Sequence, residues 1–288
     1  MGLLVSDPQH FQIPLIAELQ APASWCTVDF ISDLHLQAGE PATFGAWQHY
    51  MQTTPADAVF ILGDLFDVWI GDDVLGPVSS SAADQPDRSF ESRCAQVLGD
   101  AASRLALFFM HGNRDFLVGQ SAAGESLPGR CHATLLADPC ALTFAGQRWL
   151  LSHGDALCLD DLAYMTFRRQ VRSAAWQQAF LARPLVERQQ IASDLRRQSR
   201  QQHDRRSQSG EPYADVDADA ARQWLRAAGA HTLIHGHTHQ PATHDLQDGL
   251  RRVVLSDWDA DPHGARPRAE VLRLSAETAD SLQRIRLV

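Results

Sequence analysis

Short runs of apolar residues recur along the chain, and longer segments of mixed polarity separate them. A continuous apolar run bounded by polar residues is typical of a strand that is buried on both faces of a sheet. The pattern predicts buried strands at residues 25–31, 58–62, 105–110, 148–151, 232–234 and 252–255.

Segments of helix length lie between several of these strands, at residues 44–52, 90–103 and 217–228. The last segment has acidic residues near its start and is followed by Gly229. Acidic side chains are favourable at a helix N-terminus, and glycine is common just beyond a helix C-terminus. Helices that alternate with buried strands indicate a layered α/β fold.

The first residues of the chain lack this pattern. Residues 1–24 contain Pro8, Pro14 and Pro22, and each proline interrupts regular structure. We therefore expect a loosely attached N-terminal tail, followed by one domain that extends over residues 25–288.

Residues 160–206 also differ from the rest of the chain. Their apolar residues show helical spacing, which is broken near Pro184. Ten arginines and three acidic residues lie between Arg168 and Arg206. We expect this segment to form a helical cap that is inserted into the sheet domain.

The composition argues against several classes of protein. The formal net charge of −10 disfavours nucleic-acid binding, because that affinity comes largely from a basic surface. All 25 basic residues are arginine, so a P-loop lysine and a Schiff-base lysine are excluded. No stretch approaches the roughly 18 apolar residues of a spanning helix, and the N-terminus lacks a secretory-signal pattern. The five cysteines show neither disulfide nor metal spacing, so we expect a cytoplasmic protein.

Five short blocks of potential metal ligands directly follow apolar runs. The ends of strands are where α/β sheets build their sites, and glycines within the blocks would let backbones approach closely. Side chains two apart on an extended chain point the same way, so we expect each D-x-H or H-x-H pair to address one cluster. The blocks are Asp33 and His35, Gly63-Asp64, Gly112-Asn113-Arg114-Asp115, His153-Gly154-Asp155, and His235-Gly236-His237-Thr238-His239.

One such block alone would carry little weight. A lone aspartate after a strand is usually a turn residue or a helix N-cap, and a lone histidine is usually a surface residue. Five blocks that share this context are much harder to explain as turns. Imidazole, carboxylate and amide ligands without cysteine suit Mn, Fe or Zn. The sequence therefore predicts a metal site at the ends of the strands.

The blocks resemble the D-x-H, G-D, G-N-x-D, H-G and G-H-x-H blocks of the calcineurin-like metallophosphoesterases, over about residues 26–255. The resemblance implies an α/β sandwich of two mixed β-sheets flanked by helices, with the cap inserted. It also implies two divalent metal ions, which activate a bound water and hold the phosphorus oxygens during in-line attack. The implied ligands are Asp33, His35, Asp64 and His239 for one ion, and Asp64, Asn113, His153 and His237 for the other.

Arg114 occupies the position after Asn113, where many members of the family have a histidine that can assist the leaving group. Arginine stays protonated at physiological pH and is a poor general acid, but its shape suits phosphate oxygens. This residue favours a leaving group that needs no proton, such as the phosphate of a diphosphate.

The wider sequence around residues 63–73, 111–117, 153–161 and 235–241 resembles the UDP-2,3-diacylglucosamine diphosphatases of lipid A biosynthesis in Gram-negative bacteria. That resemblance implies attack of water on the α-phosphorus, commonly with Mn²⁺, giving UMP and a diacylated glucosamine 1-phosphate. It implies catalytic roles for Asn113, Arg114 and His237. The implied substrate contacts are Asn113, Arg114, Asp161, Ser199, His203, Arg206 and His237. Two of them depart from the usual pattern, because the family commonly has asparagine in place of His203 and lysine in place of Arg206.

The cap suits a lipid substrate, since acyl chains need an apolar slot and arginines can face anionic headgroups. We therefore expect a UDP-diacylglucosamine lipid as substrate, peripheral contact with the cytoplasmic face of the inner membrane, and a monomer. Candidates for the slot are Leu162, Met165, Phe167, Val171, Trp176, Phe180, Leu185 and Ile191. The alternative is that these residues simply pack the cap against the core.

Two other functions remain open at this point. The first is a dinuclear-metal nucleotide or protein phosphoesterase whose cap serves another purpose. The second is a non-catalytic scaffold on the same fold, since a fold does not fix a function. Such scaffolds usually lose ligands, whereas all seven ligand positions hold ligand types in this chain.

Overall fold

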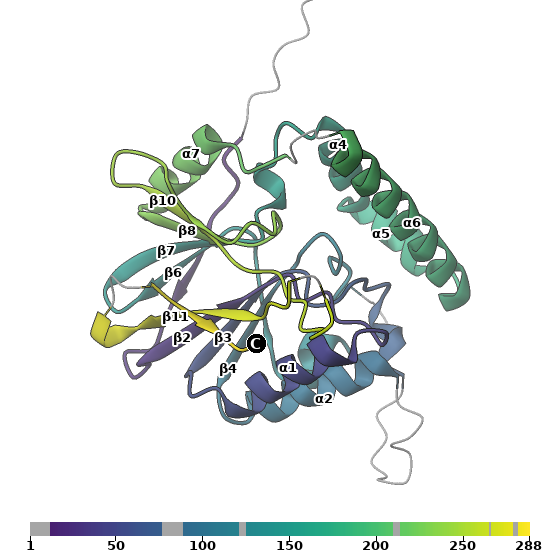
Figure 1. Ribbon diagram of the computed structural model, residues 1–288, viewed down its shortest axis with the longest axis horizontal. Coiled ribbons are helices and arrows are strands. Elements are labelled where there is room, and N and C mark those ends of the chain that lie inside the picture. The colour runs from purple at the N-terminus through teal and green to yellow at the C-terminus, as the bar shows by residue number, and fades with distance from the viewer. Residues whose placement is uncertain (1–11, 77–88, 121–124, 210–213, 265, 279–281) are drawn as a thin grey trace, which may run out of the picture.

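Two six-stranded β-sheets pack face to face in the computed structural model (Figure 1). The structure describes residues 12–76, 89–120, 125–209, 214–264, 266–278 and 282–288, without the side chains of residues 198–209. Sheet A consists, in spatial order, of β1 (Ala17–Gln20), β6 (Cys140–Phe144), β7 (Gln147–Ser152), β8 (Thr232–His235), β10 (Arg251–Val254) and β9 (Thr243–Asp245). Sheet B consists of β12 (Leu282–Arg286), β11 (Glu270–Ser275), β2 (Thr27–Ile31), β3 (Ala58–Leu62), β4 (Ala106–Met110) and β5 (Thr134–Leu136).

Both sheets are mixed, as the family resemblance implies. In sheet B the strands β2, β3, β4 and β5 are parallel, while β11 runs antiparallel to β2 and to β12. In sheet A the strands β7, β8 and β10 are parallel, while β6 and β9 run antiparallel to their neighbours β7 and β10. The parallel strands of each sheet therefore end at one common edge.

The strands alternate their side chains between two buried faces. In β3, Phe60 points into the core between the sheets, whereas Val59 and Ile61 point toward the helices outside sheet B. The rings of Phe30 and Phe108 stack on either side of Phe60, with centroid distances of 5.2 and 4.6 Å. Because both faces of these strands are covered, their sequences are continuously apolar, which is the pattern that revealed them.

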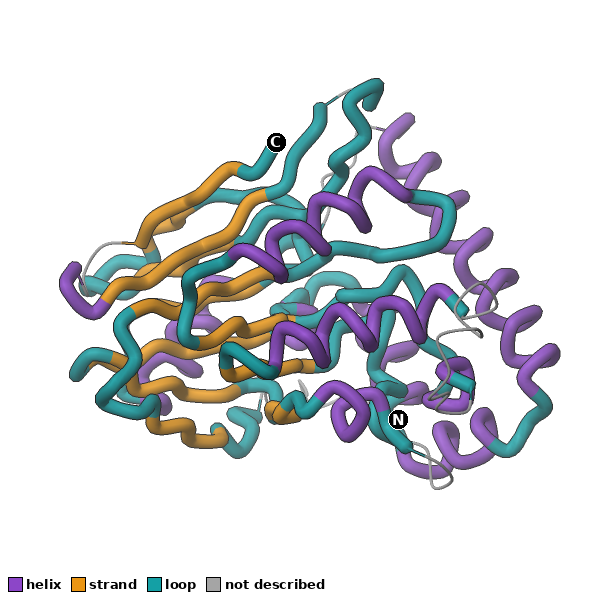
Figure 2. The backbone as a smooth tube through the Cα atoms, turned by 90° about the horizontal axis from the view of Figure 1, so that it is seen from below, coloured by secondary structure: helices purple, strands orange, loops and turns teal. Residues whose placement is uncertain are grey.

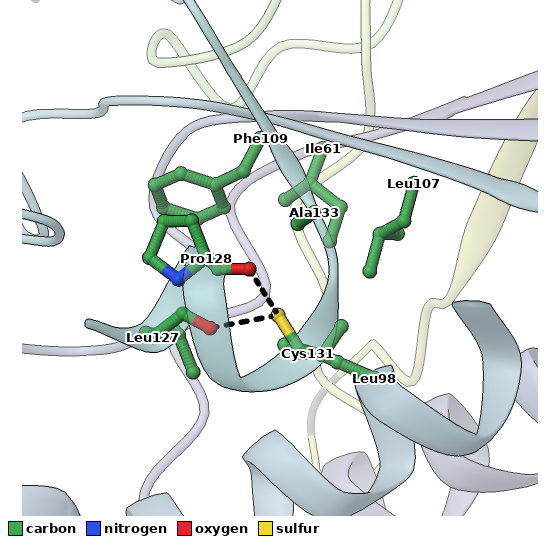
Figure 3. A pocket seen from close by; sticks show the side chains of 8 residues that line it. All are labelled: Ile61, Leu98, Leu107, Phe109, Leu127, Pro128, Cys131 and Ala133. Atoms are coloured by element: carbon green, nitrogen blue, oxygen red, sulfur yellow. Dashed lines mark hydrogen bonds between the residues drawn. The ribbon is translucent and has the colours of Figure 1, made fainter. Parts of the chain in front are cut away.

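Helices cover the outer faces of the sandwich. The helices α1 (Pro41–Thr53), α2 (Phe90–Ala102) and α3 (Leu127–Cys131) share the apolar core outside sheet B, and α7 (Ala218–Ala228) packs on sheet A. The predicted ends of α7 are confirmed, because Asp217 accepts a hydrogen bond from the backbone N–H of Ala220 and Gly229 has a φ of 60°. A small apolar pocket lies between α2, α3 and sheet B, and the side chains of Leu98, Phe109 and Cys131 are among those that line it (Figure 3).

Part of the segment predicted as a tail is a strand. Residues 17–20 form β1, which pairs in parallel with β6, and the adjoining Ala21 is buried. The backbone hydrogen bonds of this edge strand hold it in place, so the expectation of loose attachment is corrected for these residues. Residues 1–11 of the expected tail lie outside the described residues.

The segment expected to form a cap consists of α4 (Leu162–Val171), α5 (Ala174–Leu181) and α6 (Leu185–Ser209), and Pro184 lies in the break between α5 and α6. These helices lie at one end of the strands and do not cover the face of either sheet (Figures 1 and 2). Among the described residues, no helix has both the length and the hydropathy required to cross a bilayer.

Candidate metal centre

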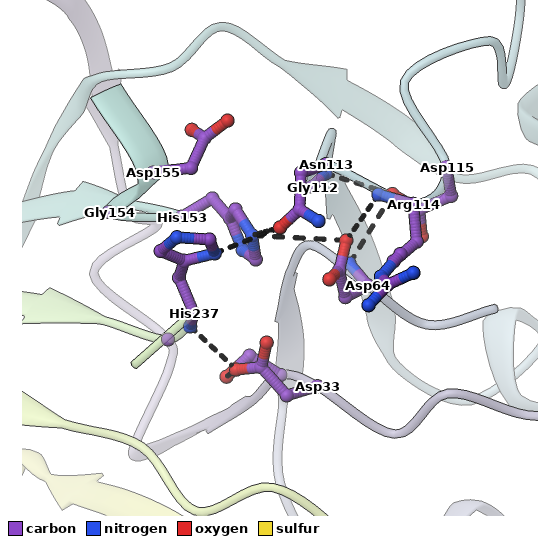
Figure 4. A network of polar contacts seen from close by, with 12 residues as sticks. Asp33, Asp64, Gly112, Asn113, Arg114, Asp115, His153, Gly154, Asp155 and His237 are labelled. Atoms are coloured by element: carbon purple, nitrogen blue, oxygen red, sulfur yellow. Dashed lines mark hydrogen bonds and ion pairs between the residues drawn. The ribbon is translucent and has the colours of Figure 1, made fainter. Parts of the chain in front are cut away.

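The turns that follow β2, β3, β4, β7 and β8 converge on one cluster of polar side chains. Figure 4 shows the side chains of Asp33, Asp64, Asn113, His153 and His237 in this cluster. The turns bring together all seven residues predicted as metal ligands, although the first and the last are 206 positions apart in the sequence. The ligand atoms fall into two groups that share Asp33.

The first group contains Asp33, His35 and His239, whose ligand atoms lie within 4.8 Å of one another. The Nε2 atoms of the two histidines are 3.2 Å apart, and Nε2 of His239 is 3.4 Å from Oδ1 of Asp33. This Oδ1 atom is buried and has no hydrogen-bond partner within the described structure. A buried carboxylate oxygen without a partner is costly, so a cation between these three side chains would fit the group well.

The second group contains Asp33, Asp64 and His153, with ligand atoms again within 4.8 Å of one another. Asn113 extends this group, because its Oδ1 accepts hydrogen bonds from Nε2 of His153 at 3.0 Å and Nδ1 of His237 at 2.9 Å. Two imidazoles and an amide oxygen thus converge on one point beside two carboxylates. The residue that both groups share is Asp33, whereas the family resemblance assigns the bridging position to Asp64.

Several of these ligands sit on left-handed backbone. The φ angles are 55° at Asp33, 48° at His35, 54° at Asp64, 68° at His237 and 52° at His239. The expectation that each pair of ligands lies on extended chain is therefore wrong. A residue other than glycine pays about 1–2 kcal/mol for this conformation, and such strain clusters at functional sites. In this conformation the side chain of His237 contacts Asn113 and that of His239 contacts Asp33.

Two glycines allow the blocks to approach each other. A Cβ atom at Gly112 would collide with the backbone nitrogen and the carboxylate of Asp64, and one at Gly236 would collide with Asp33 and Ser32. The prediction that glycines permit close backbone contact at the site is confirmed at both positions.

Burial and crowding of charge shift the pKa values of the two carboxylates. Burial raises the pKa of Asp64, and the neighbouring carboxylates of Asp115 and Asp33 raise it further. Burial also opposes ionisation of Asp33, but the adjacent His239, with smaller contributions from the charges of His153 and His35, outweighs it and lowers the pKa of Asp33. Such opposite shifts within one cluster are characteristic of functional sites.

The histidines are shifted by the same two causes. Burial lowers the pKa of His35 and of His237 to about 3 each, so both rings are neutral at physiological pH. Burial opposes protonation of His153 as well, but the charges of Asp64 and Asp33 raise its pKa to about 9. Nδ1 of His153 donates to the carbonyl oxygen of Leu62 at 2.9 Å, which leaves Nε2 facing the cluster.

Asp115 is a supporting residue whose role the sequence leaves undecided. Its buried carboxylate accepts hydrogen bonds from the backbone N–H groups of Gly112 at 2.8 Å and Leu65 at 2.8 Å, with longer contacts to those of Asp64 and Phe66. It thereby ties the turn after β4 to the turn after β3. In the sequence, only the position of Asp115 two residues after Asn113 indicated a role at the site.

The predicted substrate contacts are distributed around the same turns. The backbone N–H of Arg114 donates to Oδ1 of Asp64 at 2.7 Å, and its side-chain charge contributes to the low pKa of His35. Asp161 caps α4, where its Oδ1 accepts a hydrogen bond from the N–H of Tyr164 at 3.0 Å. The side chains of the remaining predicted contacts lie outside the described residues; these are Ser199, His203 and Arg206.

Asp155 belongs to a predicted ligand block but points away from the cluster (Figure 4). Its buried carboxylate accepts hydrogen bonds from Tyr164 Oη at 2.7 Å and Arg168 Nε at 2.8 Å, and it lies 3.6 Å from Arg172. The ring of Tyr164 lies against that of His237, with centroids 5.6 Å apart. Asp155 therefore connects α4 of the cap to the turn that carries His153.

Other cap arginines also face acidic residues of the core. Arg188 is buried and pairs with Asp73, and Arg196 pairs with Asp67. The expectation that the cap arginines face anionic headgroups is thus corrected for four of them, which pair with acidic residues instead: Arg168, Arg172, Arg188 and Arg196. Exposed arginines remain at positions 169, 183 and 197.

The eight candidate slot residues of the cap differ in their burial. Phe180 is buried in the core outside sheet B, and Trp176, Leu185 and Ile191 pack against that core. These four residues therefore pack the cap against the core, which is the alternative that the sequence left open. Leu162 is 75% exposed and Phe167 is 38% exposed, so neither is covered by the core. Val171 is buried, and Met165 is half-buried.

The chain is similar in sequence to several known proteins. The sequence model described as calcineurin-like phosphoesterase matches residues 26–241. A protein from Ralstonia nicotianae named UDP-2,3-diacylglucosamine hydrolase is 44% identical over 255 residues, which are 86% of this chain and 88% of that protein. A protein of the same name from Chromohalobacter salexigens is 41% identical over 237 residues, 81% of this chain and 89% of its own length. An archaeal phosphodiesterase of known structure gives a TM-score of 0.44 at 10% identity, over 90% of this chain and 99% of that one.

Proposed function

Because this chain belongs to the calcineurin-like phosphoesterase family, we propose that it hydrolyses the diphosphate of UDP-2,3-diacylglucosamine in lipid A biosynthesis. The observation that carries the proposal is the identity of 41 to 44% with proteins named for this activity, over more than four fifths of the chain. The clustering of all seven predicted ligand side chains supports it, because loss of catalysis on this fold would leave no reason to keep them together.

Two divalent cations fit the residues that converge at the site. Asp33, His35, Asp64 and His239 would hold one cation, and Asp64, Asn113, His153 and His237 would hold the other. Cations bound there would lower the pKa of a coordinated water and neutralise phosphate oxygens. The oxygen and nitrogen ligands suit Mn²⁺, which we propose as the native metal. The hydrogen bonds of Asp115 and of Leu62 to the ligand turns pre-organise this arrangement in the chain itself.

Arg114 supplies the contact with the diphosphate in this proposal. Its Nε is buried and has no hydrogen-bond partner in the described structure, so the guanidinium is available to an anionic ligand. Attack at the α-phosphorus would make 2,3-diacylglucosamine 1-phosphate the leaving group and UMP the other product. A phosphate monoester leaves without being protonated, so the lack of acidity of Arg114 is no obstacle.

The cap is proposed to bind the lipid part of the substrate and to contact the cytoplasmic face of the inner membrane. The exposed side chains of Leu162, Phe167 and Val186 offer apolar surface on α4 and α6. Exposed arginines at positions 169, 183 and 197 offer positive charge to anionic headgroups. Asp161 at the start of α4 is proposed to contact the substrate, together with Ser199, His203 and Arg206 of α6.

The direct test is to incubate the purified protein with Mn²⁺ and UDP-2,3-diacylglucosamine and to measure UMP. We expect UMP from the wild type and a large loss in an Asn113→Ala variant, and in ¹⁸O-labelled water the label should enter UMP. Equal turnover of soluble nucleotide diphosphates would instead indicate a general nucleotide phosphoesterase. Absence of both turnover and metal binding would indicate a non-catalytic scaffold.

A further inference from the structure

Asp257 lies on the outer side of the His239 ring. Oδ2 of Asp257 is 3.6 Å from Nδ1 of His239. The other ring nitrogen, Nε2, is 3.4 Å from Oδ1 of Asp33 and 3.2 Å from Nε2 of His35. The imidazole therefore lies between a carboxylate on one side and the candidate cation site on the other.

The carboxylate of Asp257 is itself held in place. Nε of Arg268 donates to its Oδ1 at 2.8 Å, and a second guanidinium nitrogen pairs with its Oδ2. Arg268 is fixed in turn, because its backbone exchanges two hydrogen bonds with Asp259, of 2.7 and 2.8 Å. This bidentate geometry restricts the direction in which the carboxylate can point.

The need for such support is greatest at His239. Its side chain is 41% exposed, whereas the side chains of Asp33 and His153 are fully buried. Packing consequently restrains the ring of His239 less than it restrains the other two ligands. The neighbouring Trp258 donates its backbone N–H to the carbonyl oxygen of Asp33 at 3.1 Å, so the same turn contacts two residues of the first group.

We propose that Asp257 is a positioning residue that keeps the imidazole of His239 in the Nδ1–H tautomer, with Nε2 directed at the cation. A histidine that binds a metal commonly faces a carboxylate with its other ring nitrogen, which fixes the tautomer and raises the basicity of the ligand. Arg268 acts one step further out by orienting Asp257. The inference rests on the proposed function, because it assumes that His239 binds a cation.

The test measures Mn²⁺ binding to metal-free protein without substrate, by chelator competition and by electron paramagnetic resonance. In Asp257→Asn, we expect one of the two ions to bind about 10- to 100-fold more weakly while the other is unchanged. At limiting Mn²⁺ the spin-coupled signal of an ion pair should give way to that of single ions. Arg268→Gln should weaken the same ion by a smaller factor, and it provides a second route if Asp257→Asn folds poorly.

Asp259→Asn is the matched control. Asp259 lies in the same turn and 3.9 Å from Arg268, and within the described part of the chain it makes no hydrogen bond or ion pair with His239. It should bind both ions as the wild type does. Wild-type binding by Asp257→Asn, or equal weakening of both ions with a lower melting temperature, would overturn the inference. If the wild type itself bound no Mn²⁺, the proposed function would fail instead, so the two failures are distinguishable.

Discussion

The backbone N–H of His237 donates a hydrogen bond of 2.9 Å to Oδ2 of Asp33, across 204 positions of sequence. The same oxygen accepts a hydrogen bond from Oγ of Ser32 at 2.6 Å. Oδ2 is thus satisfied by the protein, while the buried Oδ1 has no hydrogen-bond partner in the described structure and faces the other ligands. One carboxylate therefore joins the first and last ligand blocks and still offers a free oxygen to a cation.

Replacing Asp33 by asparagine should separate its role in joining the two blocks by hydrogen bonds from its proposed role in binding a cation. The amide keeps the size of the side chain but removes the negative charge that a divalent cation requires. We expect kcat/KM to fall about a thousandfold, equivalent to about 4 kcal/mol of transition-state stabilisation. Steady-state kinetics with saturating Mn²⁺ measures this, and exposed Asp160→Asn serves as the control. Retention of more than a tenth of wild-type kcat/KM would argue against Asp33 as a ligand.

Mn²⁺ affinity should rise with pH. The pKa of Asp64 is raised by burial and by its neighbouring carboxylates, and the pKa of His153 is raised to about 9 despite its burial. Both groups therefore hold protons more firmly than usual in the metal-free protein, and a cation must displace them. From pH 6.5 to 8.5 we expect affinity to increase by about tenfold per unit for each proton released. Calorimetry in two buffers of different ionisation enthalpy counts these protons, and a pH-independent affinity would contradict the assignment.

Asp155→Asn should weaken the attachment of the cap. The substitution leaves Arg168 and Arg172 without their buried counter-charge, and we expect a loss of about 3 kcal/mol in the free energy of unfolding at pH 7. Burial opposes ionisation of Asp155, but the two arginines outweigh it and lower its pKa. Because the pKa of Asp155 is lowered, its ionised carboxylate stabilises the folded protein at pH values above the ordinary pKa of 3.8. This stabilisation is lost as the pH falls below 3.8 toward the lowered pKa.

Urea unfolding of the metal-free protein measures this effect, and limited proteolysis of α4 and α5 reports whether the cap is released. Asp160→Asn, an exposed neighbour in sequence, should change the unfolding free energy by less than about 0.5 kcal/mol. Equal stabilities of Asp155→Asn and the wild type at pH 7 would show that the arginines are not held by this carboxylate.

Arg114→Lys tests the proposed diphosphate contact. Lysine keeps the charge but lacks the planar guanidinium that can bind two oxygens at once. We expect kcat/KM to fall about thirtyfold, or about 2 kcal/mol, with unchanged Mn²⁺ binding. Arg226→Lys, at an exposed position paired with Asp248, should leave the kinetics unchanged. Wild-type kinetics in Arg114→Lys would remove Arg114 from the substrate site.

The strands that the sequence predicts best are those with both faces buried. Residues 58–62 are all apolar and form β3 with the predicted bounds. The internal strands β6 and β11 escaped prediction, and so did the edge strands β1 and β12. In β1 and β12 exposed side chains interrupt the apolar run. Edge strands are specified by pairing with distant neighbours, and that pairing leaves little trace in a local pattern.

The candidate site was predictable in its residues but not in its backbone. Residue type and the family resemblance singled out seven side chains that the fold brings together, yet nothing local indicates that Asp33 and His35 adopt positive φ. The supporting roles of Asp155 and Asp257 depend on arginines 13 and 11 positions further along the chain, and only the folded structure shows which arginine faces which carboxylate. A run of charged residues in a sequence indicates that ion pairs can form, but it does not indicate which residues pair.

The central claim is that two cations bind side by side among these turns. Anomalous diffraction at the manganese edge, from crystals grown with Mn²⁺, tests it most directly. The account predicts two peaks about 3.5–4 Å apart, one beside Asp33, His35 and His239 and the other beside Asn113, His153 and His237. A single peak, or manganese bound only outside this cluster, would contradict it.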